Sequence, residues 1–185
     1  MKACLLLLLY LGLANSYAAE CLRTPEMPAG LKQEHYRSPT PACVPTGITL
    51  KTAELQKLIE TDQPLLIDVM AVFLREDEGF PATWLVNEPH DSLPNSIWLP
   101  NVGYGVLKPN IETWFKAQLA KLTKNDPKQA LVFYCVADCW MSWNTVQRVR
   151  EYGYTRVYWY KEGTDGWKEA GLPLVKTEPQ AFESD

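Results

Sequence analysis

Cys135 directly follows a run of apolar residues at 130–134, and Cys139 comes four residues later. The run predicts a buried parallel strand, and open α/β sheets place their ligand sites at the carboxyl ends of strands. A thiol at that position faces the N-terminus of the following helix, where free backbone N–H groups and the helix dipole stabilise a thiolate. Because the thiolate is the nucleophile, we predict that Cys135 is a reactive cysteine rather than a buried structural one.

The second cysteine of the pair allows further chemistry. Cys139 lies in the same strand-to-helix loop as Cys135, so the two sulfurs could close a small ring as a redox disulfide. A disulfide across so short a loop adds little stability, which suits a redox pair better than a structural bridge. Met141 is a nearby soft donor, so a copper(I) site is an alternative, whereas no second ligand pair has the spacing of a zinc site. We predict no resident metal and no cofactor.

Alternating strands and helices are predicted to position this loop. Short apolar runs predict strands at residues 47–50, 65–69, 96–99, 130–134 and 156–159. Helical spacing of apolar residues predicts helices at 53–60 (with Thr52 as N-cap), 109–122 and 142–152, and a last helical turn at 166–170. This alternation indicates an α/β fold with a central parallel sheet and helices on both of its faces.

Residues 70–95 do not fit the alternation. A connection of this length is typically functional or partly disordered, and its acidic cluster at 76–78 is expected to be a solvated face. His90 lies in this connection and His35 lies nearer the N-terminus. Neither histidine has a spaced partner, so we predict that both are surface residues. Of the tryptophans, Trp140 and Trp143 flank the cysteine loop and either pack in the core or form a docking surface.

The composition excludes several classes of protein. The chain has 185 residues, which is enough for one ordinary domain, and its 46% hydrophobic and 22% charged residues argue against disorder. With a net charge of -4 and a pI near 5.3, it has no basic field to attract nucleic acid or anionic lipid. We therefore expect no nucleic acid among its partners.

The N-terminus has the pattern of a secretory signal peptide. Lys2 precedes an apolar stretch at residues 5–13, and small residues follow before Glu20. The stretch is well short of the roughly 20 residues that span a membrane, which disfavours an anchor. We predict a signal peptide at residues 1–19 that is cleaved on export, leaving no membrane segment in the mature chain.

Cleavage would leave an even number of cysteines in an exported chain, which permits two disulfides. The separations favour Cys21 with Cys43, and Cys135 with Cys139. Residues 20–46 are rich in proline and have little apolar periodicity, so we predict an extended N-terminal arm. A Cys21–Cys43 disulfide would tie this arm into a loop.

Several segments together resemble a known family. Asp68 and Cys135 each end a predicted strand, residues 94–100 read Pro-Asn-Ser-Ile-Trp-Leu-Pro, and residues 159–173 place a glycine-rich turn and a tryptophan before Ala-Gly-Leu-Pro. In these features the chain resembles a rhodanese-like domain over about residues 47–175. The resemblance implies one such domain, so the predicted segments are a signal peptide, an arm, a rhodanese-like domain and a C-terminal tail, at residues 1–19, 20–46, 47–176 and 177–185.

The cysteine loop also resembles a narrower, exported group. Residues 134–144, which read Tyr-Cys-Val-Ala-Asp-Cys-Trp-Met-Ser-Trp-Asn, are similar to the PQQ-dependent catabolism-associated CXXCW motif proteins, and residues 99–105 and 162–167 agree with them. Those proteins accompany periplasmic quinoprotein alcohol dehydrogenases. The resemblance therefore implies a periplasmic location and a quinoprotein dehydrogenase as partner. The family motif has two residues between its cysteines, whereas three lie between Cys135 and Cys139.

The loop departs from those of ordinary sulfurtransferases in the family. Their loops usually contain Gly and Arg, which let backbone amides converge on thiosulfate and balance its charge. Between Cys135 and Ser142 there is neither, and Asp138 adds a negative charge that disfavours an anionic donor and raises the pKa of a nearby thiol. The predicted substrate loop consists of Val136, Ala137, Asp138, Trp140, Met141 and Ser142.

These observations lead to two hypotheses of different kinds. In the first, Cys135 accepts a sulfane sulfur as a persulfide, with the loop amides holding the developing charge, or forms a disulfide with Cys139 as the resolving partner. Its partner is then a sulfur donor or a thiol substrate. In the second, the protein is a non-catalytic binding or assembly factor for a periplasmic quinoprotein dehydrogenase, which the missing Gly and Arg favour.

Overall fold

The computed structural model describes residues 27–183 and is built on a five-stranded parallel sheet in the order β1-β8-β7-β2-β6. Every neighbouring pair in this sheet is parallel, as the alternation of strands and helices predicted. The carboxyl ends of the strands therefore share one edge. The strands are β1 (Ile48–Leu50), β2 (Leu65–Asp68), β6 (Ile97–Trp98), β7 (Leu131–Tyr134) and β8 (Val157–Tyr160).

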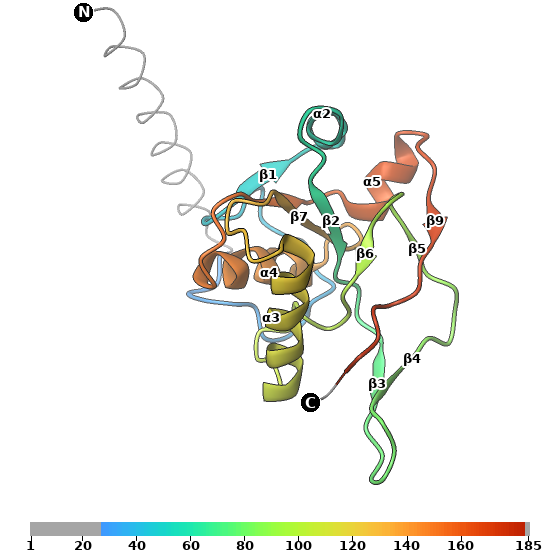
Figure 1. The fold of residues 1–185 in the computed structure, drawn as a ribbon. Helices are drawn as coiled ribbons and strands as arrows, with labels where there is room; N and C mark the ends of the chain where they lie inside the picture. The colour runs from blue at the N-terminus through green and yellow to red at the C-terminus, as the bar shows by residue number, and fades with distance from the viewer. Residues whose placement is uncertain (1–26, 184–185) are drawn as a thin grey trace, which may run out of the picture.

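Helices cover both faces of this sheet (Figure 1). On one face, α3 (Pro109–Thr123) and α4 (Trp140–Glu151) pack against inward-pointing side chains such as Leu131 and Phe133. On the other face, α2 (Thr52–Asp62) and α5 (Gly163–Glu169) pack against the alternate residues of the same strand, Val132 and Tyr134. This alternation follows from the two-residue period of a strand, so β7 is fully buried on both faces. The predicted α/β fold is confirmed.

Three helices begin at residues other than those predicted, and one of them, α5, begins at Gly163 rather than Gly166. Thr52 is not the N-cap of α2 but its first residue, and its backbone N–H and hydroxyl both donate to the carboxylate of Glu162, at 2.9 and 2.6 Å. Glu162 thus satisfies the helix terminus from a distant part of the chain. Helix α4 begins at Trp140 rather than Ser142, so that Cys139 is its N-cap residue.

Residues 70–95 contain three short strands, which were not predicted from the sequence. Strands β3 (Phe73–Arg75) and β4 (Thr83–Leu85) make an antiparallel hairpin, and the acidic cluster at 76–78 lies exposed between them. Strand β5 (Asp91–Ser92) pairs with β9 (Val175–Lys176) near the C-terminus. The hairpin extends beyond the body of the domain in Figure 1.

The C-terminal segment is packed against the domain. Phe182 is buried between Trp84 and Trp114, with ring centroids 5.3 and 5.5 Å away. The indole N–H groups of these tryptophans donate to the carbonyl oxygens of Gln180 and Ala181. The segment therefore closes the end of the core next to the β3–β4 hairpin.

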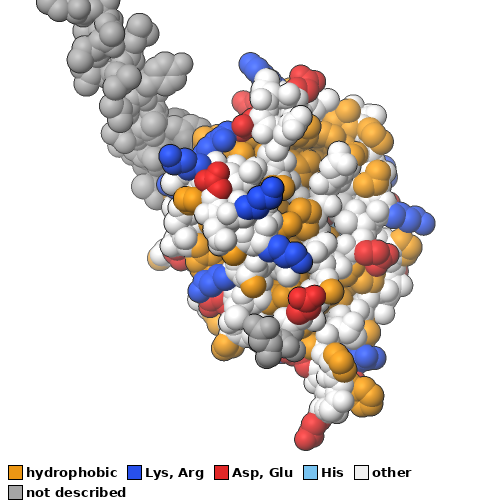
Figure 2. Space-filling model, in the orientation of Figure 1, with side chains coloured by type: hydrophobic (Ala, Val, Ile, Leu, Met, Phe, Trp, Pro, Cys, Tyr) orange, Lys and Arg blue, Asp and Glu red, His pale blue; other side chains and the backbone are white. Residues whose placement is uncertain are grey.

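The surface carries charges of both signs. On the face shown in Figure 2, Lys and Arg side chains are interspersed with Asp and Glu, in keeping with the small net charge of -4. Within residues 27–183, none of the helices has the length and apolar character needed to cross a membrane. The predicted signal peptide at residues 1–19 lies outside the described residues.

Candidate thiol site

The two cysteines of the loop lie at the carboxyl edge of the sheet. Cys135 directly follows β7, and Cys139 is the N-cap residue of α4. Both are free thiols in the structure, and they are only 1% and 3% exposed. The fold therefore brings the two predicted site residues together as a buried, reduced pair.

The environment of Cys139 favours its thiolate. Its pKa is lowered, chiefly because the Cys135 thiol hydrogen-bonds to its sulfur. The backbone N–H groups of Met141 and Ser142, in the first turn of α4, act in the same direction, as does the positive charge of Arg37. These interactions outweigh the burial of the sulfur, which acts against its ionisation.

The environment of Cys135 favours its neutral thiol. Complete burial raises the pKa of this thiol well above its ordinary value, and the hydrogen bond to Cys139 adds to the shift. The thiol also contacts the thioether sulfur of Met70 at 3.8 Å. We expected the helix amides to stabilise the thiolate of Cys135. They instead stabilise that of Cys139, because α4 begins immediately after Cys139.

Two backbone amides of the predicted substrate loop, those of Ala137 and Trp140, are already hydrogen-bonded. The N–H of Ala137 donates to the carboxylate of Asp165, and the N–H of Trp140 donates to the carbonyl of Tyr36, both at 2.9 Å. These two amides are therefore not free to hold an anion such as thiosulfate. Val136 and Ala137 are half-buried, Asp138 is exposed, and the remaining predicted loop residues are buried, namely Trp140, Met141 and Ser142.

The buried members of the loop have structural contacts. The Ser142 hydroxyl donates to the carbonyl of Cys139 and accepts the indole N–H of Trp159. Trp140 and Trp143 are 2% and 1% exposed and meet edge to face, with ring centroids 5.1 Å apart. Of the two roles considered for these tryptophans, the structure therefore shows core packing.

The N-terminal arm lies across the cysteine loop. Arg37 pairs with Cys139 in an isolated antiparallel bridge, and the backbone N–H and hydroxyl of Thr40 both donate to the Asp138 carboxylate. The Asp138 carboxylate is thus engaged by the arm. The expectation that Asp138 raises a nearby thiol pKa is not met at Cys139.

Cys43 also fixes the arm to the domain. Cys43 is disulfide-bonded, and its carbonyl accepts the indole N–H of Trp143 at 3.1 Å. Its predicted partner, Cys21, lies outside the described residues, so the Cys21–Cys43 pairing stays a prediction. Val44 next to it is fully buried in the main core.

A buried carboxylate anchors the strand end beside the thiols. Asp68 is 0% exposed and accepts the backbone N–H of Met70 at 2.9 Å and the Ser92 hydroxyl at 2.7 Å. His90 Nε2 lies 2.8 Å from the same carboxylate, and its ring packs on Trp98 with centroids 4.3 Å apart. The prediction that His90 is a surface histidine without a partner is wrong, because the β4–β5 segment folds it back onto the sheet edge. His35 is exposed, as predicted.

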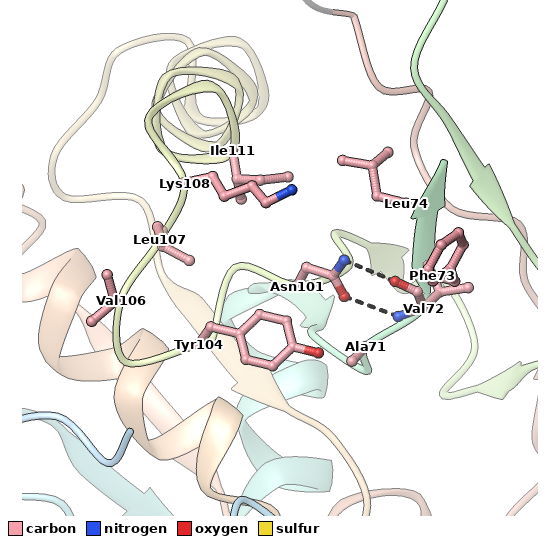
Figure 3. A pocket seen from close by; sticks show the side chains of 10 residues that line it. All are labelled: Ala71, Val72, Phe73, Leu74, Asn101, Tyr104, Val106, Leu107, Lys108 and Ile111. Carbon is pink, nitrogen blue, oxygen red and sulfur yellow. Dashed lines mark hydrogen bonds between the residues drawn. The ribbon is translucent and has the colours of Figure 1, made fainter. Parts of the chain in front are cut away.

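A cavity of about 580 Å³ opens next to the thiol site (Figure 3). Its walls come from the chain after β2 and the chain after β6, and are mostly apolar. Asn101 uses its side chain to bond both backbone groups of Val72, and Lys108 is paired with Glu76, so their polar groups are engaged. The lining residues are Ala71, Val72, Phe73, Leu74, Asn101, Tyr104, Val106, Leu107, Lys108 and Ile111.

Two of the residues that line the cavity, Ala71 and Tyr104, lie next to residues around the thiol site. On one side Ala71 follows Met70, whose sulfur touches that of Cys135. On the other side Tyr104 packs edge-on against Tyr36, at a centroid distance of 5.2 Å. In Figure 3 the Tyr104 hydroxyl points toward Ala71. Because it lies at the carboxyl edge of the sheet, this cavity is the candidate substrate site.

Comparison with known proteins identifies the family. A model of the rhodanese-like domain family matches residues 51–170, which is more than half of the chain. The chain belongs to the rhodanese-like domain family. No curated protein matches this rhodanese-like protein.

Several solved structures share distant similarity with this rhodanese-like protein. The polysulfide-sulfur transferase homodimer of Wolinella succinogenes is 22% identical over 70% of this chain and 79% of its own, with a TM-score of 0.43. The thiosulfate sulfurtransferase of Pseudomonas aeruginosa is 19% identical over 75% of this chain but only 22% of its own, with a TM-score of 0.49. A rhodanese-like domain from Anabaena is 14% identical over 70% of this chain and 79% of its own, with a TM-score of 0.46. Such distant similarity carries no argument about activity.

Sequence reasoning missed two neighbours of the thiols. Met70 could have been found, since it comes two residues after Asp68, at the end of a predicted strand and hence at the same sheet edge as Cys135. Arg37 gave no signal, because nothing in the proline-rich arm indicates where it docks. Within residues 27–183, no group of three or more His, Cys, Asp or Glu side chains is placed to hold a metal ion.

Proposed function

We propose that this rhodanese-like protein carries out thiol–disulfide exchange with Cys139 and Cys135. The observation that carries the proposal is the asymmetry of the pair. One sulfur is stabilised as a thiolate at a helix N-terminus, and the other is a buried neutral thiol hydrogen-bonded to it. An attacking thiolate beside a protonated resolving thiol is the arrangement that exchange requires.

The reaction proceeds in two displacements. The Cys139 thiolate attacks a substrate disulfide, forms a mixed disulfide and releases the first substrate thiolate. Cys135 then gives its proton to the departing sulfur and attacks the Cys139 sulfur, which releases the second substrate thiol. The substrate disulfide is reduced to two thiols while the pair is oxidised to a disulfide, and a second dithiol must reduce this disulfide for turnover. The sequence assigned the attack to Cys135, whereas the geometry favours Cys139.

Sulfur transfer is the second candidate, and membership of the rhodanese-like family favours it. The Cys139 thiolate would attack the outer sulfur of an organic persulfide, forming a persulfide on Cys139 and releasing the donor as a thiol. A thiol acceptor would then attack that outer sulfur, becoming a persulfide itself and releasing the Cys139 thiolate. Thiosulfate suits this site poorly, because the loop amides at Ala137 and Trp140 are occupied. The apolar cavity instead supports a thiol or persulfide with an apolar body as substrate.

Intact mass after alkylation without reduction separates these candidates. The full chain would be exposed to an organic disulfide, or to a polysulfide, before alkylation. For exchange we expect a closed Cys135–Cys139 disulfide in the wild type and a trapped mixed disulfide on Cys139 in Cys135→Ser, whereas Cys139→Ser reacts slowly. A gain of one sulfur atom, with the pair still open, would instead establish sulfur transfer. If both single variants behave like the wild type, neither candidate holds.

We further propose that the protein is exported to the periplasm and serves a quinoprotein dehydrogenase there. The signal-like segment at residues 1–19, the disulfide at Cys43 and the resemblance of residues 134–144 to the CXXCW motif proteins support this. An assembly role without exchange remains the rival hypothesis. Affinity capture of a dehydrogenase by both the wild type and Cys135→Ser would favour assembly, whereas capture that depends on Cys135 would favour exchange.

A further inference from the structure

The arm segment around Arg37 is fixed on both sides. Before Arg37, the carbonyl of Tyr36 accepts the backbone N–H of Trp140 at 2.9 Å. After it, Ser38 accepts the indole N–H of Trp140 at 3.0 Å, and Thr40 donates twice to Asp138. Arg37 itself forms the antiparallel bridge with the attacking cysteine. Its position over the loop is therefore set by contacts along the whole segment rather than by its own side chain.

The guanidinium of Arg37 has no competing partner in the described part of the chain. The ion pairs found among residues 27–183 do not include it, and the residue is exposed. Two lysines that contact this region are engaged by other groups. Lys161 donates to the carbonyls of Thr40 and Pro41, and Lys32 lies over the Trp140 ring at 5.0 Å. The positive charge of Arg37 is therefore available to the loop.

Groups from several segments face the Cys139 sulfur. Cys135 comes from the end of β7, and Tyr104 comes from the chain after β6 and has its pKa raised mainly by burial, with a smaller contribution from Cys139. Asp138 precedes Cys139, but its carboxylate is bound by Thr40. Among these groups the only cation comes from the arm. It is Arg37, whose positive charge helps to lower the pKa of Cys139.

We propose that Arg37 is a positioning residue of the thiol site, brought by the arm to the Cys139 sulfur in place of the arginine that the loop from Cys135 to Ser142 lacks. The inference rests on the proposed function, since it concerns the attacking sulfur of the exchange. It makes the arm part of the site and not only a cover over it. The two roles predict opposite effects, because loss of a cation slows the reaction of a thiolate and loss of a cover speeds it.

The test is the pH profile of Cys139 alkylation by iodoacetamide in the reduced full chain, followed by peptide mapping. In Arg37→Gln we expect the rate at neutral pH to fall roughly three- to tenfold and the profile to move to higher pH, because an opposite charge lowers a thiol pKa and solvent screens an exposed one. Arg37→Lys should restore most of the rate. The difference from wild type should shrink at high salt.

Two controls isolate the charge at the loop. Arg75→Gln removes a half-buried arginine that pairs with Asp77 on the β3–β4 hairpin, and should leave the profile unchanged. Thr40→Val loosens the arm without removing the cation, and should move the profile in the same direction as Arg37→Gln. Ultraviolet absorbance of the thiolate during a pH titration gives a second measure of the same pKa that does not depend on access of the reagent.

An unchanged or faster rate in Arg37→Gln, with an unshifted absorbance titration, would overturn the proposal and leave the arm as a cover. This outcome is distinct from failure of the proposed function. If the profile shifts as expected but the wild type never forms a Cys135–Cys139 disulfide with an organic disulfide, the role of Arg37 stands and the exchange reaction fails. If exchange proceeds and the profile does not shift, the exchange reaction stands and the role of Arg37 fails.

Discussion

Replacing Gly163 with alanine should destabilise the fold by about 2–4 kcal/mol and displace the backbone at Cys135. Gly163 has a φ of +57°, which an alanine adopts only with strain. A Cβ at this position would lie 2.3 Å from the carbonyl oxygen of Cys135 and 2.8 Å from the carbonyl carbon of Val136. These are backbone atoms, so no side chain can move aside. The measurement is chemical denaturation, with the rate of Cys139 alkylation as a reporter of loop geometry.

Gly171→Ala is the matched control for this substitution. Gly171 also has a positive φ, +73°, but nothing lies within 4 Å of the Cβ that would be added. This variant should cost only the conformational strain, about 1 kcal/mol, and leave alkylation of the loop unchanged. If Gly163→Ala is no more destabilising than Gly171→Ala, the close approach between α5 and the cysteine loop does not control the site.

The sheet could be predicted because its strands are buried on both faces. In β7, all four residues from Leu131 to Tyr134 are apolar or aromatic, and each is fully buried. A continuous apolar run of this length is expected only in a strand that is buried on both faces, so the sequence alone predicts it. Helix α3 was equally clear, since Pro109 marks its first residue and the apolar face continues to Thr123.

The limits of prediction lie in contacts between residues far apart in the sequence. Glu162 caps α2 from 110 positions away, and the Thr40–Asp138 contact spans 98 positions. No periodicity or turn chemistry reports such pairs. His90 was misjudged for the same reason, since its partner Asp68 lies 22 positions earlier, on the other side of the β3–β4 hairpin in the sequence.

The candidate site shows the same division between local and distant signals. The position of the cysteine pair after β7 could be predicted, because its signal lies in neighbouring residues of the sequence. Which sulfur receives the helix amides depends on where α4 begins, and that depends on the turn at Asp138, whose φ of +51° directs the chain into the helix at Trp140. The sequence showed an arginine missing from the loop but could not show that the arm carries one to it.

Replacing Asp68 with alanine should lower the free energy of unfolding by about 3 kcal/mol or more. The carboxylate is fully buried and is the shared acceptor for the Met70 backbone N–H and the Ser92 hydroxyl, with His90 Nε2 at 2.8 Å. Removing it leaves these polar groups without their buried acceptor. Chemical denaturation measures the loss.

The loss of Asp68 should also affect the thiols, because Met70 contacts both groups. Its backbone N–H donates to the Asp68 carboxylate, and its sulfur contacts that of Cys135. The negative charge of Asp68 also helps to raise the pKa of Cys135, whose largest cause is burial, so Asp68→Asn should make this thiol ionise at lower pH. Asp91→Ala, an exposed neighbour in β5, is the control and should change stability by no more than about 0.5 kcal/mol. A loss below about 1 kcal/mol in Asp68→Ala would contradict the prediction, because buried polar groups without partners cost more than that. Such a result would mean that the sheet edge relaxes around the missing carboxylate, and that the thiol pair is not held from the β2 side.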